Sequence, residues 1–183
     1  IVNAARVSFG KEKKEIDGKD KRLIKYLIRH RHTSTLEHNV VTFRFCVPLF
    51  VRSQHHRHRT WSYNEISRRY TDENLQFYEP KLFRTQHKSN RQASNEEDMI
   101  NPLMQIYDPA CSKPMSILSS KLVENFHKDA LKYYDSLLEA GVCREQARGI
   151  LPQNLYTEYY GTVNLNNLIK FISLRTHDGA QQE

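Results

Sequence analysis

Residues 54–70 carry an unusual concentration of side chains that could do chemistry. Four arginines and three histidines lie there beside one glutamate and two serines. A protein core cannot hold so many polar groups unless each one finds a partner. The planar donors of arginine suit phosphate and carboxylate oxygens, and a glutamate among them can orient an arginine or accept from a ribose hydroxyl. The stretch indicates a site for an anionic ligand, in particular a nucleotide.

The order of these residues is more informative than their composition. Residues 57–59 read Arg-His-Arg and are followed after seven residues by Ser67, and Glu65 and Arg69 flank that serine two positions away on either side. A charge run is often only a helix end followed by a solvated loop. The ordered spacing favours a binding motif over that alternative.

The length and composition are those of one globular domain. At 183 residues the chain can bury a substantial core, and it has no apolar run near the ~20 residues that span a bilayer. The net charge of +7 favours an anionic partner but does not distinguish nucleic acid from a small phosphorylated ligand. Cys46, Cys111 and Cys143 are too widely spaced, and odd in number, for a disulfide framework. We therefore expect a cytoplasmic protein without a membrane segment.

Apolar spacing predicts the elements that must position the motif. Repeats of three and four residues are typical of amphipathic helices, and the alternation in residues 41–47 is typical of a strand with one buried face. Pro48 suits the first turn of a helix that carries the Arg-His-Arg motif at its end, and Gly141 suits a left-handed helix stop. Residues 84–114 are polar and lack periodicity, so we expect a flexible surface excursion within the single domain. The predicted helices are 19–30, 48–58, 117–140, 143–151 and 164–174, and the predicted strands are 41–47 and 156–163.

Several other segments have recognisable patterns in a fixed order. Residues 4–8 read Ala-Ala-Arg-Val-Ser, and residues 144–152 read Arg-Glu-Gln-Ala-Arg-Gly-Ile-Leu-Pro. Together with residues 54–70 they resemble the flavin-dependent thymidylate synthases. The resemblance extends over nearly the whole chain except residues 84–114. Its remaining segments are 32–38, 164–175 and the start of a closing motif at 179–183.

The resemblance implies an activity, a fold and an assembly. The uracil of dUMP would be methylated at C5 to give dTMP, with 5,10-methylenetetrahydrofolate as carbon donor and NADPH as reductant through FAD. Tetrahydrofolate would be released. The implied fold is α+β, a single domain over residues 1–183 with an antiparallel-type sheet flanked by long amphipathic helices. The implied assembly is a homotetramer whose active sites are shared between subunits. No cysteine lies in a nucleophile motif, which agrees with a flavin route.

The resemblance also assigns substrate roles. Arg175 is the expected catalytic residue, because a guanidinium at the uracil edge favours ionised N3 and a more nucleophilic C5. Arg69 and Arg148 suit the 5′-phosphate. The alternatives are a surface ion pair with a nearby glutamate for Arg148 and a helix-terminal contact for Arg175. Ser67 has no Ser-His-Asp arrangement around it, so we expect it to bind and orient. The expected dUMP residues are Gln54, His55, His56, Arg57, Glu65, Ile66, Ser67, Arg68, Arg69, Arg148 and Arg175.

The flavin assignments include two departures from the family pattern. Asn166 replaces an arginine that is frequent in relatives, and Lys170 stands where an amide is common, so contacts to the FAD pyrophosphate would differ in detail. Gly179 stands where some relatives carry histidine. A histidine such as His58, taken without the motif, is more often structural than ligand-binding. The expected FAD residues are His32, Ser34, Arg57, His58, Arg59, Glu65, Asn164, Leu165, Asn166 and Lys170.

Three competing interpretations remain at this stage. His30, His32 and His38 could suggest a metal site, but no carboxylate pattern completes one, and we expect no metal. A basic nucleic-acid-binding domain would explain Trp61 and Tyr63 among arginines, but not the separate arginines downstream. A flavin-free homologue would explain the departures in residues 164–175. The enzyme remains the preferred interpretation, with neither nucleic acid nor membrane as a partner.

Overall fold

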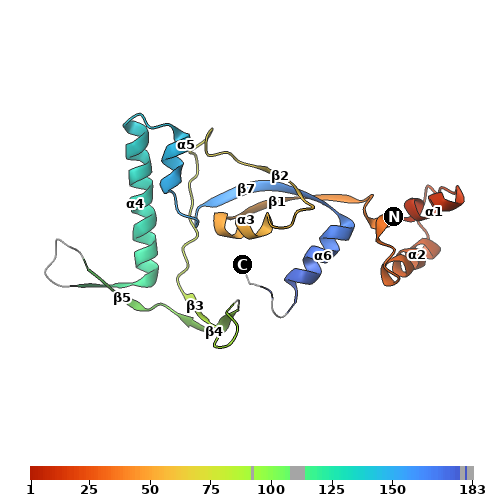
Figure 1. Ribbon diagram of the computed structural model, residues 1–183, viewed down its shortest axis with the longest axis horizontal. Coiled ribbons are helices and arrows are strands. Elements are labelled where there is room, and N and C mark those ends of the chain that lie inside the picture. The colour runs from red at the N-terminus through yellow and green to blue at the C-terminus, as the bar shows by residue number, and fades with distance from the viewer. Residues whose placement is uncertain (92, 108–113, 178–179, 181–183) are drawn as a thin grey trace. The chain divides into compact units, whose positions relative to one another are not determined.

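The computed structural model describes residues 1–91, 93–107, 114–177 and 180. The fold is mixed, with helices and small sheets that are labelled in Figure 1. Cys111 and most of the expected closing motif at residues 179–183 lie outside the described residues. The elements are α1 (Val2–Arg6), η1 (Val7–Phe9), α2 (Gly18–Arg29), η2 (Thr33–Leu36), β1 (Val40–Pro48), α3 (Leu49–His55), β2 (Ser62–Glu65), β3 (Phe83–Gln86), β4 (Ser94–Ile100), β5 (Leu103–Ile106), β6 (Met115–Leu118), α4 (Ser119–Glu139), α5 (Arg144–Ala147), η3 (Arg148–Ile150), β7 (Tyr156–Asn164) and α6 (Leu165–Arg175).

The long predicted helices are confirmed, and their ends have clear local causes. Asp17 caps α2 by accepting from the backbone N–H groups of Lys19 and Asp20, and the Asp20 side chain completes the capping box. Asn164 caps α6 in the same way through the backbone N–H of Asn167. Gly141 follows α4 with a φ of 86°, the left-handed conformation that its position predicted. None of the helices that the structure describes is long and apolar enough to cross a bilayer.

Three strands form the main sheet, in the order β1-β7-β2. Burial alternates along β7, where Thr157, Tyr159, Gly161 and Val163 are buried. Strand β2 is not among the strands predicted from the sequence. Its short sequence shows no periodicity of its own, and it becomes a strand through pairing with β7.

The expectation of one buried face on β1 is wrong for the chain taken alone. Val41 and Phe43 are exposed, and the strand is buried only at Pro48. The predicted helix at 48–58 is also shorter than expected. Pro48 ends β1, and α3 ends at His55, so the Arg-His-Arg motif lies after the helix and not within it.

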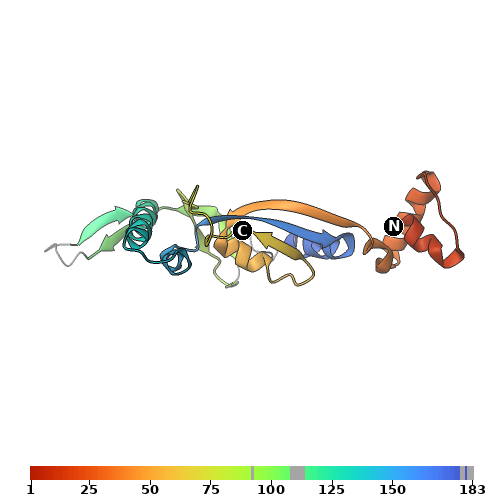
Figure 2. The same ribbon diagram turned by 90° about the horizontal axis from the view of Figure 1, so that it is seen from above.

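The described residues of 84–114 are not irregular as the sequence suggested, because most of them lie in strands. Strands β3 and β4 pair antiparallel, as do β5 and β6, and the second hairpin leads directly into α4 (Figure 2). Polar side chains bridge the first hairpin, because the Thr85 hydroxyl donates to Asp98 over 2.9 Å and Asn95 donates to Thr85 over 3.0 Å. Because polar side chains form these cross-strand pairs, the sequence of the hairpin has no alternation of apolar and polar residues. The strands were therefore not recognised from the sequence.

The chain divides into two compact units, which are described separately. The first unit contains the described residues of Ile1–Phe45, His56–Asn64 and Tyr159–Asp178. The second contains those of Cys46–His55, Glu65–Glu158 and Gly179–Glu183.

Each unit has its own packed centre. In the second unit Tyr134, Ala147, Leu151 and Leu155 form a buried cluster against which partly buried leucines of α4 pack. In the first unit the rings of Phe45 and Tyr159 stack with centroids 5.0 Å apart. The packing centres hold α4 and α5 in the second unit, and α6 with the larger part of β7 in the first.

Candidate functional site

The predicted site residues fall into two groups, one in each unit. The second unit carries Gln54, His55, Glu65, Ile66, Ser67, Arg68, Arg69 and Arg148. The first unit carries His32, Ser34, His56, Arg57, His58, Arg59, Asn164, Leu165, Asn166, Lys170 and Arg175.

A cleft of about 510 Å³ in the second unit brings five of the predicted dUMP residues together. They come from segments that are far apart in the sequence, since Arg148 begins η3, Glu65 ends β2 and the other three follow β2 directly. Gln54 is exposed and His55 is buried, and neither lines this cleft. The cleft is lined by Leu49, Arg52, Glu65, Ile66, Ser67, Arg68, Glu145, Arg148, Gly149, Leu151, Gln153, Leu155, Tyr156 and Thr157.

Glu65 is held in this cleft by two residues that the sequence analysis did not identify. Its Oε1 accepts from the Thr157 hydroxyl over 2.6 Å and from Arg52 Nε over 3.0 Å. Thr157 is 4% exposed, so its hydroxyl has little access to water. Two donors on one oxygen fix the carboxylate and leave the other oxygen as an acceptor. Thr157 could have been found, because it is a polar residue on the buried face of a predicted strand.

Ser67 closes a tight turn at the edge of the cleft. Its hydroxyl accepts from the backbone N–H of Arg69 over 3.3 Å, and its carbonyl accepts from Tyr70 N–H over 3.0 Å. Arg68 Nη1 donates to the Glu73 carbonyl over 2.8 Å. Arg68 Nε is buried and has no hydrogen-bond partner among the described residues. These contacts stabilise the turn at Ser67 and leave a buried guanidinium N–H beside the cleft.

Arg148 does not form the surface ion pair that was its alternative role. Its Nε donates to the Glu145 carbonyl over 3.3 Å, whereas the Glu145 carboxylate lies 3.3 Å from Arg69 Nη2. Arg69 and Glu145 are both more than half exposed, so their pairing contributes little to stability. Arg148 therefore lines the cleft with its charge not neutralised by a carboxylate among the described residues.

In the first unit, Arg175 and His58 lie side by side. Arg175 Nη2 is 3.3 Å from His58 Nε2, and the His58 ring packs edge-on against Phe171. Burial, and then the positive charge of Arg175, lower the pKa of His58 below its ordinary 6.5. A neutral imidazole can accept from the guanidinium through Nε2, so the pair holds Arg175 without neutralising it.

Aromatic packing surrounds this pair. The Tyr63 hydroxyl donates to the His58 carbonyl over 3.3 Å, and burial raises the pKa of Tyr63 to about 12. The His56 ring lies against Tyr63, with centroids 3.9 Å apart. Arg57 and Arg59 are exposed. In this segment His56 and His58 are therefore half-buried, whereas Arg57 and Arg59 are exposed.

The second predicted flavin segment is only partly available for a ligand. Asn166 is 5% exposed and its amide donates to Glu37 over 3.0 Å, while the Asn164 side chain caps α6. Leu165 donates its N–H to the Asn39 carbonyl over 2.8 Å. Lys170 is exposed. Asn166 therefore links α6 to the loop after η2 through a structural contact.

His32 and Ser34 lie at the end of α2 and at the start of η2, and both are exposed. The His32 ring is nearly parallel to that of Tyr26, with centroids 6.2 Å apart. Within the described part of the chain, no three His, Cys, Asp or Glu side chains are grouped to hold a metal ion.

Comparisons with known proteins match the entire chain. A family model described as thymidylate synthase complementing protein matches residues 1–183. A flavin-dependent thymidylate synthase of Thermus thermophilus is 43% identical over 183 residues, and the chain spans 62% of its length. One from Thermosipho melanesiensis is 40% identical over 182 residues, with 73% of its length matched.

A solved structure is similar as well. It is a UMP/dUMP methylase from Streptomyces cacaoi, bound with 5-Br dUMP, at 34% identity and a TM-score of 0.73. The match takes in 96% of this chain and 72% of that one.

Proposed function

The chain belongs to the family of thymidylate synthase complementing proteins, and we propose that the protein is a flavin-dependent thymidylate synthase. It would methylate C5 of the dUMP uracil to give dTMP, with 5,10-methylenetetrahydrofolate as carbon donor and NADPH as reductant. The observation that carries the proposal is the cleft in which Glu65, Ser67, Arg68 and Arg148 meet. A cleft with cations, one fixed carboxylate and a turn with backbone donors has the chemistry of a nucleotide monophosphate site.

The residues of the cleft divide the recognition of dUMP among them. Arg148 lines the cleft and would bind the 5′-phosphate, and Arg69, which pairs with the cleft residue Glu145, would reach the same phosphate from outside the lining. Each charge-assisted hydrogen bond contributes ~1.5–3 kcal/mol. Glu65, held by Thr157 and Arg52, keeps one oxygen for a hydroxyl of the sugar or for an N–H group. Ser67 orients the turn that follows.

Arg175 would act on the uracil. Its guanidinium would stabilise negative charge on ionised N3 and on the adjacent carbonyl oxygen, which increases the nucleophilicity of C5. His58 keeps this guanidinium in place and, being neutral, does not compete for the negative charge. The resemblance implies active sites shared between subunits, so Arg175 and the cleft residues that act together need not come from the same copy.

The first unit fits a flavin in part. The exposed Arg57 and Arg59 suit a pyrophosphate, and His32 and Ser34 are accessible. Asn166 does not fit, because its amide is engaged by Glu37. When bound, FAD would supply the hydride chemistry that links NADPH to the new methyl group.

We propose a homotetramer for the assembly. The single chain exposes large apolar side chains that a soluble protein usually covers, among them Phe126, Tyr133 and Tyr160. Tyr159, in contrast, is already buried against Phe45. Light scattering of the purified protein should give the mass of four chains. A fully active monomer would contradict the assembly but not the activity.

The activity is tested by absorbance and product analysis. The purified protein should show visible flavin bands that bleach with NADPH, and faster when dUMP is present. Adding methylenetetrahydrofolate should then give dTMP and tetrahydrofolate in equal amounts, as measured by mass spectrometry. A colourless protein that does not take up FAD, yet binds oligonucleotides, would overturn the proposal in favour of a basic nucleic-acid-binding domain.

A further inference from the structure

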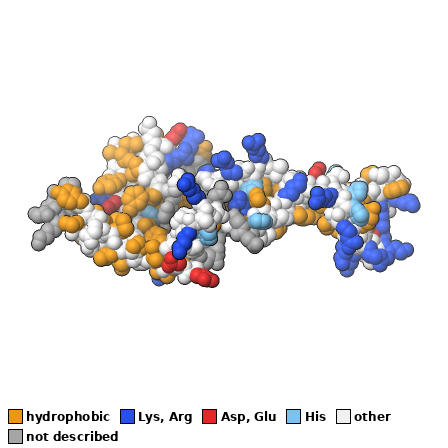
Figure 3. Space-filling model, turned by 60° about the horizontal axis from the view of Figure 1, so that its bottom comes forward, with side chains coloured by type: hydrophobic (Ala, Val, Ile, Leu, Met, Phe, Trp, Pro, Cys, Tyr) orange, Lys and Arg blue, Asp and Glu red, His pale blue; other side chains and the backbone are white. Residues whose placement is uncertain are grey.

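The N-terminal part of the first unit carries nearly all of the excess positive charge. Residues 1–32 contain ten lysines and arginines and four acidic residues, an excess of six, while the net charge of the whole chain is +7. In Figure 3 the lysine and arginine side chains gather over this region.

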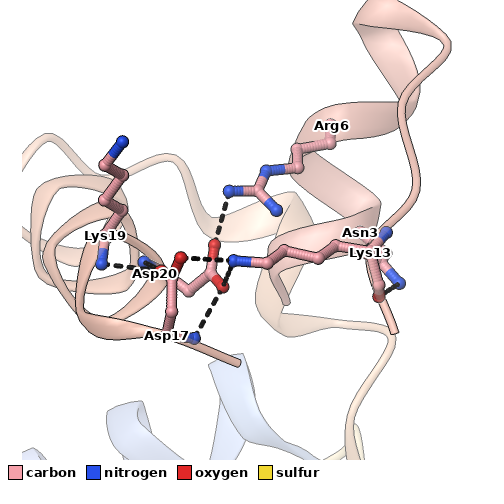
Figure 4. A network of polar contacts seen from close by, with 6 residues as sticks. All are labelled: Asn3, Arg6, Lys13, Asp17, Lys19 and Asp20. Carbon is pink, nitrogen blue, oxygen red and sulfur yellow. Dashed lines mark hydrogen bonds and ion pairs between the residues drawn. The ribbon is translucent and has the colours of Figure 1, made fainter. Parts of the chain in front are cut away.

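The carboxylates of α2 and its cap are already neutralised. Asp20 is 0% exposed and lies 2.5 Å from Arg6 Nη2 and 2.9 Å from Lys13 Nζ, and Lys13 also pairs with Asp17 (Figure 4). The hydrogen bond from Lys13 is the largest cause that lowers the pKa of Asp20. The Lys19 side chain points away from this network. No acidic group of α2 is left to balance the cations on its outer surface.

Those outer cations form a stripe. Arg22, Lys25 and Arg29 follow each other at spacings of three and four residues, so they share one face of α2 and extend over ~10 Å of its axis. All three are exposed, and no ion pair joins them to a carboxylate among the described residues. Lys21 and Arg31 are exposed as well. We call Arg22, Lys25 and Arg29 the α2 stripe.

The α2 stripe ends beside a residue with an assigned ligand role. The backbone N–H of His32 donates to the Leu27 carbonyl over 2.9 Å, and the His32 ring lies against Tyr26 on α2. His32 and Ser34 are expected FAD contacts, so a bound FAD would have the α2 stripe next to it, within the same unit. A folate that reacts through this flavin would have to bind beside it.

We propose that the α2 stripe binds a short chain of carboxylates attached to the folate co-substrate, of the kind that γ-linked glutamates add to a folate. This inference rests on the proposed function, which supplies a folate. Three cations in one row suit a short flexible polyanion. Nucleic-acid-binding proteins usually neutralise more phosphates over a larger surface. Because the stripe is exposed, its attraction is screened by salt.

The test compares folates that differ only in their tail. Steady-state kinetics are measured with methylenetetrahydrofolate carrying one or five glutamates, for the wild type and for the triple variant R22Q/K25Q/R29Q. Glutamine keeps a high helix propensity while it removes the charge. The wild type should have a KM about tenfold lower for the pentaglutamate, and the triple variant should lose this preference. The KM for the monoglutamate, kcat and the flavin spectrum should stay unchanged.

A matched control removes three charges from another helix. The variant K121Q/K128Q/K132Q on α4 should keep the wild-type preference for the pentaglutamate. Increasing the salt concentration should reduce that preference in the wild type and in the control alike. An unchanged preference in R22Q/K25Q/R29Q, or equal KM values for both folates in the wild type, would overturn the proposal.

Direct binding separates this proposal from the proposed function. A fluorescent penta-γ-glutamate peptide should bind the wild type and not R22Q/K25Q/R29Q, whether or not the protein makes dTMP. If the protein is inactive but the peptide binds in this way, only the proposed activity fails. If single-stranded RNA binds through the α2 stripe and the peptide does not, the stripe is a nucleic-acid-binding surface, and the proposal that it binds the glutamate tail of a folate is wrong.

Discussion

The Thr157 hydroxyl donates a 2.6 Å hydrogen bond to Glu65 Oε1 across 92 residues of sequence. Thr157 lies on β7 and Glu65 ends β2, so pairing in the main sheet brings the two side chains together. Arg52 on α3 contacts the same oxygen. The carboxylate that the sequence motif supplies is therefore oriented by residues outside the motif.

Replacing Thr157 with valine tests this orientation. Thr157→Val keeps the shape but removes the donor, and the Glu65 oxygen loses a partner, at a cost of ~1–3 kcal/mol. We expect the KM for dUMP to rise about tenfold or more. Thr157→Ser keeps the hydroxyl donor and should have a KM for dUMP close to that of the wild type. Thr162→Val, on the same strand, removes a hydroxyl that bonds Thr42 and should leave dUMP kinetics unchanged. Unaltered kinetics in Thr157→Val would contradict a positioning role.

Arg148 and Arg69 should differ in their effects on phosphate binding. Arg148→Gln removes a cation that lines the cleft without a carboxylate partner, and the loss of a charge-assisted bond of ~1.5–3 kcal/mol raises the KM for dUMP about 10- to 150-fold. Arg69 is about half exposed and already pairs with the Glu145 carboxylate, so Arg69→Gln should raise the KM for dUMP by less. Deoxyuridine, which lacks the phosphate, should bind both variants as it binds the wild type. Equal defects in the two variants would contradict this ranking.

The site was predictable where chemistry follows local order, and not where it depends on tertiary contacts. The spacing of Arg57, Glu65 and Ser67 indicated a binding motif from the sequence alone, and Glu65 and Ser67 line the cleft. The pairing of Arg175 with His58 connects residues 117 positions apart, and no local pattern reveals it. The contact of Asn166 with Glu37, across 129 positions, is hidden for the same reason.

The fold shows the same division. Helices α2, α4 and α6 have amphipathic repeats, and each has a capping side chain or, for α4, a glycine stop at one end, so their bounds were predicted closely. The hairpins within residues 83–118 are stabilised by cross-strand pairs such as Thr85 with Asp98, and their largely exposed faces show no apolar alternation. Phe43 alternates as a buried residue should, yet it is exposed in the single chain. The alternation of apolar residues identified β1 as a strand, but it did not show which surface packs against Phe43.

Stability should depend on pH through His58. Burial and Arg175 lower the pKa of His58 in the folded state below the ordinary 6.5, so the unfolded chain binds more protons in the interval between the two values. The contribution of His58 to the free energy of unfolding should therefore be complete above pH 6.5. It should decrease as the pH falls below this value. Denaturant unfolding above and below this pH should show the decrease in the wild type, and His58→Gln should reduce it. His38→Gln, at an exposed position, is the control and should keep it.

Gly161 should tolerate no side chain. A Cβ at this position would lie 2.9 Å from Phe45 Cε2 and 3.2 Å from Trp61 Cε3, and both rings belong to the packed centre of the first unit. Gly161→Ala should lower the free energy of unfolding by ~1–3 kcal/mol, as overpacking does in dense cores. Gly18→Ala is the matched control, because its Cβ would meet nothing within 4 Å and it begins α2, where alanine is favourable. Thermal unfolding should show a lower Tm for Gly161→Ala and an equal or higher Tm for Gly18→Ala. The reverse order would show that the aromatic packing around Gly161 yields to a methyl group.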